Sequence, residues 1–341
     1  MEEMEDVSSF SACYMEPLGR PMRLSGEMRE WPLLKPPGPL ALLVAVTGAE
    51  NVAALHFTYS VCGQQASHEI QHITMSELCR LARNPGDQEA WYLQWRALPH
   101  PRGAEGEQDR DDDGVRTEIT ANGMESEASL TGTAVERLVQ LVRRPSTVAK
   151  SALCEVNAWI GCSRTSHLHF DGKDNWLAVA LGEKEVHLYS PSQLSSLYAQ
   201  LEPSERWKSG ARSRLYLSED GTDYPLLRRA PFLKVMLRAG EMLYIPAGWF
   251  HEVLTPTFTI AFNFWFTPHP RHKFRPTILY LHSDLYARRI SEEARRLEAE
   301  CAQDSDEGSQ GSNEPHGPLG EAQAEGADCS RKRSREQPGG S

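Results

Sequence analysis

Short apolar runs separated by turn residues fill the second half of the chain, between Ser151 and Pro268. They fall at 153–160, 168–171, 175–181, 184–189, 232–238, 242–245, 250–254 and 257–266. Strands of this length, divided by turn residues, are typical of a β-sandwich or a barrel. The pattern therefore predicts a mainly β fold with flanking helices, whose core spans residues 133–270.

The first half of the chain carries fewer strand signals. Three runs are apolar or aromatic and short enough for buried strands. They are Leu40–Val46, Val52–Val61 and Trp91–Trp95. An extended segment, P-M-R-L-S, precedes them and ends at Gly26. We expect residues 21–101 to form the N-terminal part of the same domain and residues 1–20 to be loosely ordered.

Helical periodicity is confined to short stretches. Thr74 or Ser76 is placed to cap a short helix that ends at Arg83. Thr133 is placed to cap a second helix, whose apolar residues recur at helical spacing and whose end Pro145 marks. A third short helix is predicted near 191–201, inside a longer excursion between two strands.

Two polar segments divide the rest of the chain. Residues 102–132 are acidic and nearly free of large apolar side chains, and residues 303–341 are rich in Gly, Ser and Glu. Neither segment can bury enough apolar surface to offset the entropy of ordering. We therefore expect a disordered acidic insertion and a disordered tail. Between the core and the tail, Ile278–Cys301 predicts one helix within the segment 271–302.

Composition narrows the class of protein. The chain has 341 residues, 40% of them hydrophobic, and a formal net charge of −11. This charge gives no reason to expect direct binding of nucleic acid. The cysteines include no C-x-x-C pair, which favours reduced thiols in an intracellular protein. The acidic start and the lack of a long apolar run predict neither a signal peptide nor a membrane span.

An H-x-D sequence opens the strand-rich region. His169 and Asp171 flank Phe170, and the alternation of a strand places both polar side chains on one face. A neutral imidazole and a carboxylate supply two ligands of the 2-His-1-carboxylate triad that holds non-haem Fe(II). A tripeptide of this kind is short enough to occur by chance, so the prediction depends on a third ligand.

His251 is the favoured third ligand. It follows the strand Met242–Ile245 and a Pro-x-Gly turn, at the start of a returning strand. In a double-stranded β-helix the metal lies inside the barrel, with two ligands near one strand and the last on another. The alternative interpretation is a partly exposed histidine in a turn.

Lys184 is a candidate for binding an anion. On its strand it shares a face with Val186 and Leu188. A lysine on an otherwise apolar, inward face is costly to bury unpaired, and a small dicarboxylate cosubstrate would provide the missing anion. The alternative is a lysine at the end of a strand whose amine extends to water.

The last predicted strand has one apolar face and one face of small, polar and aromatic residues. The apolar face consists of Phe258, Ile260, Phe262, Phe264 and Phe266. The opposite face consists of Thr257, Thr259, Ala261, Asn263 and Trp265. The second set suits a strand that lines a ligand cavity, or simply one with a solvated face. Ser166 and Asn175 flank the H-x-D sequence and can donate hydrogen bonds to a carboxylate, or serve as ordinary turn residues.

Spaced motifs extend this pattern along the chain. They are W-I-G, S-x-L-H-x-D, N-x-L-x-x-x-x-G-x-K, L-Y-S-P, A-P-F-L, G-E-M-L-Y-I-P-x-x-W-x-H and N-F-W-F, in this order. Together they resemble the JmjC family of Fe(II)/2-oxoglutarate oxygenases, strongly over 153–268. Within that family they are most similar to the small hydroxylase branch that includes factor inhibiting HIF and the arginyl and lysyl hydroxylases. The resemblance implies a double-stranded β-helix, the jelly-roll or cupin-like JmjC barrel.

The resemblance also implies a site. The iron ligands would be His169, Asp171 and His251, and Lys184 would bind the distal carboxylate of 2-oxoglutarate. Its pocket would be completed by Ser166, Asn175, Asn263 and Tyr92. The cavity near the iron would be shaped by Trp265 and Trp159. Many relatives have threonine where Ser166 stands, so the hydroxyl group is kept. The implied cofactors are Fe(II), 2-oxoglutarate and O₂, with succinate and CO₂ as products.

Three functions are compatible with these features. The favoured one is a dioxygenase that hydroxylates a protein side chain, arginine or lysine before others. A JmjC histone lysine demethylase would use the same chemistry, although the chain has no zinc-finger reader motif. A non-catalytic cupin-like binding module is the third, and it would not need His169, Asp171, His251 and Lys184 together.

The expected partners follow from the favoured function. We expect a protein or peptide substrate, no direct contact with nucleic acid and no membrane. The C-terminal helix is expected either to pair two copies of the chain into a homodimer or to pack on its own barrel. The sequence S-R-K-R-S-R at 330–335 is either a nuclear import signal or a solvated part of the tail. Either a cytoplasmic or a nuclear location fits these features.

Overall fold

The computed structural model describes residues 3–4, 19–59, 65–98, 132–163, 166, 168–200, 210–213, 225–268, 275, 277 and 284–308. The chain divides into one unit of Met1–Cys301 and a second unit of Ala302–Ser341. In the second unit only the end of a helix is described. The fold is therefore that of the first unit.

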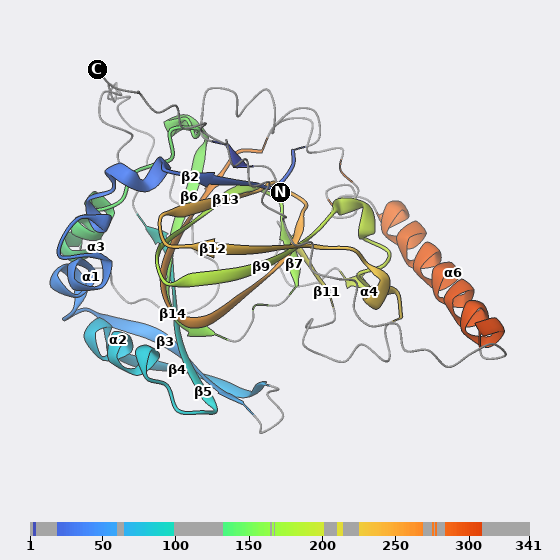
Figure 1. Cartoon of the computed structure of the whole chain (residues 1–341), viewed down its shortest axis with the longest axis horizontal. Helices are drawn as coiled ribbons and strands as arrows, with labels where there is room; N and C mark the ends of the chain where they lie inside the picture. The colour runs from blue at the N-terminus through green and yellow to red at the C-terminus, as the bar shows by residue number, and fades with distance from the viewer. Residues whose placement is uncertain are drawn as a thin grey trace, which may run out of the picture. The chain divides into compact units, whose positions relative to one another are not determined.

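Antiparallel strands build the larger of two sheets (Figure 1). Its order is β1-β2-β13-β8-β14-β6-β5-β3-β4, and the β1–β2 pair is parallel. The strands are β1 (Glu3–Met4), β2 (Met22–Ser25), β3 (Asn51–Tyr59), β4 (Gln65–Thr74), β5 (Glu89–Leu98), β6 (Leu153–Ser163), β8 (Asp174–Leu181), β13 (Glu241–Ile245) and β14 (Phe250–Phe266). The predicted mainly β fold is confirmed.

The smaller sheet shares β14 with the larger one. Its order is β12-β9-β14-β7-β11-β10. Its other strands are β7 (His169–Asp171), β9 (Glu183–Tyr189), β10 (Ala199–Gln200), β11 (Gly210–Ser213) and β12 (Leu233–Arg238). In β14, Phe250–Leu254 pair with β9, whereas Thr255 and the residues from Thr259 onward pair with β6. A bulge between Thr255 and Thr259 separates these parts, so the two strands predicted at 250–254 and 257–266 are one.

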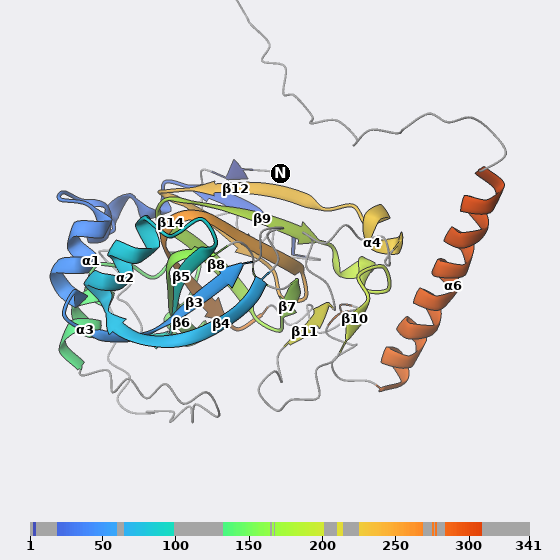
Figure 2. The ribbon, with the colours of Figure 1, turned by 90° about the horizontal axis from the view of Figure 1, so that it is seen from below.

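Helices cover one side of the larger sheet. Figures 1 and 2 both show α1 (Pro39–Thr47), α2 (Met75–Arg83) and α3 (Gly132–Gln140) close together beside it. The remaining helices are α4 (Pro225–Arg229) and α6 (Asp284–Gly308), with 3-10 turns at η3 (Glu27–Glu30), η4 (Pro32–Leu34), η5 (Lys150–Ala152) and η6 (Pro191–Gln193). The predicted cap of α2 is Thr74, whose hydroxyl oxygen accepts from the Glu77 N–H at 3.2 Å.

The strand alternation divides the buried residues between two cores. Phe262 and Phe264 of β14 pack under the helices, where Trp31 contacts both rings edge-on. Ala261, on the opposite face, packs with Val186 of β9 inside the barrel. The two faces of this strand therefore pack in two different buried clusters.

The segment Leu40–Val46 is helical, so the strand predicted there is wrong. Pro39 begins α1 after Gly38, whose φ of +104° turns the chain into the helix. The apolar residues surround the whole helix: Leu43 is fully buried, while Leu42 and Val44 are half-buried against the same core. A helix that is apolar on every side has no helical periodicity in its sequence, which is why it resembled a buried strand.

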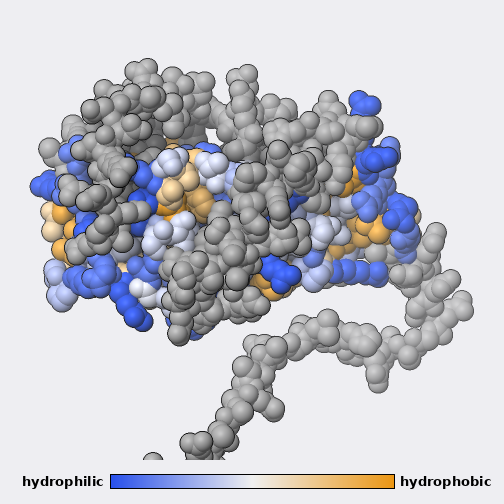
Figure 3. All heavy atoms as spheres, turned by 90° about the horizontal axis from the view of Figure 1, so that it is seen from above, coloured by the Kyte–Doolittle hydropathy of each residue, from blue (hydrophilic) through white to orange (hydrophobic). Residues whose placement is uncertain are grey.

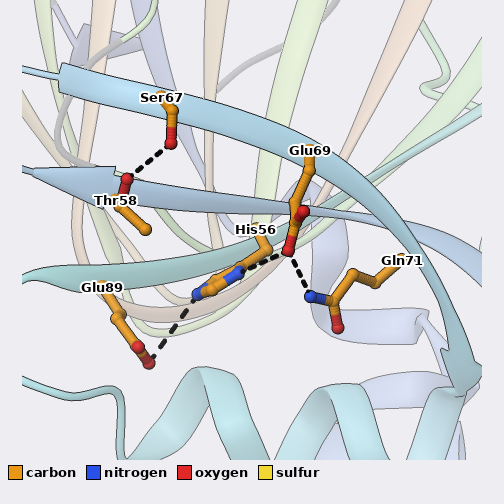
Figure 4. A network of polar contacts seen from close by, with 6 residues as sticks. All are labelled: His56, Thr58, Ser67, Glu69, Gln71 and Glu89. Carbon is orange, nitrogen blue, oxygen red and sulfur yellow. Dashed lines mark hydrogen bonds and ion pairs between the residues drawn. The ribbon is translucent and has the colours of Figure 1, made fainter.

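Strand β4 lacks the apolar alternation that predicts strands, and the sequence did not indicate it. Polar contacts connect it to its neighbours (Figure 4). Nδ1 of His56 on β3 lies 3.4 Å from Glu69 of β4, and Nε2 lies 3.7 Å from Glu89 of β5. Thr58 and Ser67 share a 2.7 Å hydrogen bond across the same pair of strands. Cross-strand polar pairs of this kind stabilise a sheet without an apolar face.

Other boundaries also differ from the predictions. Glu3–Met4, expected to be loosely ordered, forms β1. The helix expected near 191–201 is only η6, followed by turns and β10. The C-terminal helix continues past Cys301 to Gly308, so its predicted end is wrong. The acidic insertion lies outside the described residues except for Gly132, where α3 begins. Thr133 therefore lies within α3 and is not its cap, and the helix ends at Gln140, earlier than predicted.

The surface of the described residues is largely polar. Three large apolar side chains among them are exposed: Ile70, Phe232 and Leu233. On the face seen in Figure 3, the coloured apolar residues form separate patches bordered by hydrophilic ones. Within the described part of the chain, no helix has the length and apolar character needed to cross a membrane.

Candidate metal centre and cosubstrate pocket

Two adjacent strands of the smaller sheet bring three potential metal ligands together. Strand β7 carries His169 and Asp171, and β14 places His251 directly opposite His169. The ligand atoms of the three side chains all lie within 4.8 Å of one another. The residues predicted from distant parts of the sequence therefore form one cluster.

The hydrogen bond of His251 leaves one ring nitrogen available to a cation. Nδ1 lies 3.1 Å from the carbonyl oxygen of Trp249. Because a carbonyl only accepts, this contact places the ring hydrogen on Nδ1 and leaves a lone pair on Nε2. Nε2 lies 3.7 Å from Oδ2 of Asp171, and the His169 and His251 ring centroids are 4.3 Å apart. The lone pair, the carboxylate and the second imidazole thus lie close together.

Lys184 is buried, as the alternation of β9 predicts. The residue is 1% exposed. Its Nζ donates to the hydroxyl of Tyr92 at 3.0 Å and to that of Thr255 at 2.8 Å. No described carboxylate pairs with it, and burial lowers the pKa of its amine to about 7. A charged lysine in this position lacks the anion that would offset its desolvation.

Three further predicted residues line the inner face of the larger sheet. Trp265 on β14 is paired with Asn175 on β8, and Asn263 lies two residues before Trp265 on the same face. Oδ1 of Asn175, Oδ1 of Asn263 and Nε1 of Trp265 are buried without a hydrogen-bond partner among the described residues. Unpartnered buried polar atoms are uncommon in proteins and indicate a place where a ligand or water binds.

Ser166 and Trp159 lie beside β14, and Tyr92 contacts Lys184. The Ser166 hydroxyl accepts from the Val253 N–H at 2.9 Å, and its own N–H donates to the Val253 carbonyl. Ser166 is thus held beside β14 between His251 and Thr255. The rings of Tyr92 and Trp159 are stacked with centroids 6.3 Å apart. The structure therefore brings His169, Asp171 and His251 into one cluster, and it brings Lys184 into contact with Tyr92.

A comparison with known families identifies the domain. Residues 19–272, which contain all of these side chains, match the family model described as a cupin-like domain. The chain belongs to the cupin-like domain family. The expected jelly-roll architecture, mainly antiparallel sheet with few helices, is therefore confirmed.

Relatives of this cupin-like chain carry several names. It is 36% identical over 132 residues to tRNA wybutosine-synthesizing protein 5 of Gallus gallus. This aligned region makes up 38% of this chain and 36% of that protein. It is 32% identical over 131 residues to lysine-specific demethylase JMJ31 of Arabidopsis thaliana, and that aligned region makes up 38% of this chain and 24% of that protein. The similarity thus spans only about a third or a quarter of these relatives. The solved structure of E. coli ycfD shares 12% identity and a TM-score of 0.41, over 82% of this chain and 58% of that chain.

The residues of this cupin-like barrel fit a non-haem iron and a dicarboxylate. Two imidazoles and one carboxylate are the donor set that binds Fe(II) with open positions. The unpaired ammonium of Lys184 suits a carboxylate, and the buried amides and indole offer further hydrogen bonds. The donor set would hold the metal, and the cation would pair with a carboxylate of the dicarboxylate.

Thr255 is a pocket residue that sequence reasoning missed. It is 2% exposed and holds Lys184 from the strand that also carries His251. Its position, four residues after His251 on the same strand face, was available in the sequence. Pro256, next in the chain, made this segment resemble a turn rather than the interior of a strand.

The lowered pKa of Lys184 predicts that the ligand-free protein is more stable at alkaline pH than at neutral pH. Its pKa is about 7 when folded and near 10.5 when unfolded, so the unfolded state binds more protons between these values. The free energy of unfolding should rise with pH across that window, by at most about 1.4 kcal/mol per pH unit. The destabilisation is complete below the folded pKa and absent above the unfolded one.

Urea denaturation of the wild type and of Lys184→Met at several pH values measures this contribution. We expect the variant to be more stable near neutral pH, and the difference between the two proteins to disappear towards about pH 10. A difference that stays constant with pH would show that Lys184 is not desolvated in the folded protein.

Proposed function

We propose that this chain is an Fe(II)- and 2-oxoglutarate-dependent dioxygenase that hydroxylates a protein side chain, arginine or lysine before others. The products of the cosubstrate would be succinate and CO₂. The observation that carries this proposal is the cluster of His169, Asp171 and His251 in the same barrel as the buried, anion-free Lys184. A binding module has no need for both.

One set of side chains would bind the metal, and another would bind the cosubstrate. His169, Asp171 and His251 would hold the iron, which when bound supplies the redox chemistry with O₂ and the keto acid. Lys184 would pair with the distal carboxylate of 2-oxoglutarate, supported by the hydroxyls of Tyr92 and Thr255.

Net charge does not decide between a protein and a nucleic-acid substrate. Residues 102–132 and 303–341 carry −6 and −4 of the formal net charge of −11, so the rest of the chain is nearly neutral. The names of the relatives point to two other outcomes, lysine demethylation and the synthesis of wybutosine in tRNA. Both would start from the same metal and cosubstrate pocket, so they differ from the proposal only in the substrate.

Turnover of 2-oxoglutarate by the purified full chain tests the proposal. The chain is incubated with Fe(II), ascorbate and 2-oxoglutarate, with peptide pools rich in arginine or lysine, with methyl-lysine peptides, or with tRNA. We expect succinate release stimulated by an unmodified peptide, which gains one oxygen atom by mass spectrometry. Formaldehyde from methyl-lysine peptides alone, or oxygen incorporation into tRNA alone, would contradict the proposed substrate class. No succinate in any mixture would contradict the enzyme itself.

A further inference from the structure

The turn before His251 connects two of the candidate metal ligands. It consists of Pro246, Ala247, Gly248 and Trp249, between β13 and β14. The N–H of Gly248, whose φ is +83°, donates to the carbonyl oxygen of Asp171 at 2.8 Å. The carbonyl of Trp249 accepts from Nδ1 of His251. The backbone of this turn therefore sets where His251 stands relative to Asp171.

Two buried side chains of opposite charge hold the centre of this turn. Oδ1 of Asp174, which begins β8, accepts from the N–H of Ala247 at 2.7 Å. The guanidinium of Arg275 donates to the carbonyl oxygen of the same residue. Asp174 is 0% exposed and Arg275 is 6% exposed. One buried alanine thus has both backbone polar groups bound by charged side chains from distant parts of the chain.

The segment after the barrel adds two more contacts to the same turn. The hydroxyl of Thr277 donates to the Gly248 carbonyl at 2.9 Å. Arg275 also donates to the carbonyl of Gly19 at 3.3 Å, and so does Nε1 of Trp249 at 3.2 Å. The turn is therefore held from three sides: by β8, by the residues that precede β2, and by the residues that follow β14.

A contribution to stability alone does not explain why Asp174 and Arg275, which hold this turn, are charged. Burial lowers the pKa of Arg275, and the charge of Asp174 opposes this effect. Buried charges often contribute no more to stability than apolar side chains of the same volume would. Their hydrogen bonds, however, fix the direction of both peptide groups of Ala247 in a low-dielectric interior. Such fixation matters where a backbone must place a ligand within a fraction of an ångström.

We propose that Asp174 and Arg275 are positioning residues for the metal centre, which hold the Pro246–Trp249 turn so that His251 and Asp171 bind one cation together. The inference rests on the proposed function in so far as it assumes a metal between these ligands. Neither residue belongs to the cluster of candidate ligands, and both act through the backbone of Ala247. Thr277 assists through Gly248, whose N–H is bound to the Asp171 carbonyl.

Titration of the metal-free full chain with Co(II) tests the positioning role without any turnover. The visible absorption of bound Co(II) reports both affinity and coordination geometry. We expect Arg275→Met to weaken Co(II) binding by about 10-fold, the lower end of the loss caused by removing a direct hydrogen-bond partner of a metal ligand, because Arg275 acts through the backbone of Ala247. Arg275→Lys keeps one donor and should recover part of the affinity. Thr277→Val, which is nearly isosteric, should weaken binding less and decides the matter if Arg275→Met does not fold.

Two controls separate positioning from general destabilisation. Leu78→Ala removes a buried side chain of α2 far from the turn, and it should lower stability with unchanged Co(II) affinity and spectrum. Arg289→Met changes an exposed arginine and should alter neither. The positioning role is overturned if Arg275→Met and Thr277→Val bind Co(II) like the wild type, or if Leu78→Ala weakens binding as much. Absence of Co(II) binding by the wild type would instead overturn the proposed function.

Discussion

Alanine in place of Asp171 will abolish succinate release from 2-oxoglutarate. The carboxylate is the only anionic donor in the cluster with His169 and His251, whose ligand atoms lie within 4.8 Å of one another. Two neutral imidazoles alone bind Fe(II) weakly, because they neither offset its charge nor complete three ligands on one face. Since even outer partners of metal ligands are worth about 10- to 100-fold in affinity, loss of this ligand should exceed about 100-fold.

The measurement has two parts. Succinate release with a stimulating peptide should fall to background, and Co(II) titration should show the matching loss of affinity. Asp87→Ala, on the exposed turn before β5, is the matched control and should leave both unchanged. If Asp171→Ala kept the affinity of the wild type, the metal would have to bind elsewhere, and the assignment of the centre would be wrong.

Methionine in place of Lys184 will raise the 2-oxoglutarate concentration needed for half-maximal turnover by roughly 100-fold. Removing one partner of a buried, hydrogen-bonded charge pair costs about 2–5 kcal/mol, and each 1.4 kcal/mol corresponds to a factor of ten. Methionine nearly preserves the volume of the side chain, so the barrel wall should remain packed. Without its cation, the pocket formed by Tyr92 and Thr255 has only hydroxyl groups to offer a carboxylate.

Co(II) binding in the absence of 2-oxoglutarate separates this effect from damage to the metal centre, and it should not change in Lys184→Met. Lys234→Met is the matched control, because Lys234 lies on the neighbouring strand β12 and pairs with Glu185 at 3.0 Å on the outer surface. That variant should keep the wild-type dependence on 2-oxoglutarate. A wild-type dependence in Lys184→Met would remove Lys184 from the cosubstrate pocket.

The strands could be predicted where burial alternates. In β9 the inward Lys184, Val186 and Leu188 are all buried, and in β14 the two faces carry visibly different residues. The signal failed where the environment did not alternate. Helix α1 is apolar on every side, and β4 is polar on both. In both cases tertiary contacts decide the conformation, and these are absent from any local window of sequence.

Some residues of the candidate site could likewise be predicted from the sequence, and others could not. The chemical groups of His169, Asp171, His251 and Lys184 are distinctive enough to be recognised from spacing and motif. Thr255 was missed because one threonine before a proline carries no signal of its own. Asp174 and Arg275 were missed because both act on the backbone of Ala247, and no pattern of side chains indicates which carbonyl a distant guanidinium will reach.

Strand β14 carries the candidate metal ligand His251 in one sheet and the candidate pocket residues Asn263 and Trp265 in the other, with the bulge between them. Because strand side chains alternate, one residue inserted into either part would exchange its inward and outward sides, and His251 or Asn263 would leave the interior. The bulge has no such alternation to preserve, and Pro256 and Thr257 within it are exposed. For protein engineering, this is the point of β14 where a change of length or a spectroscopic label leaves both halves of the barrel in register.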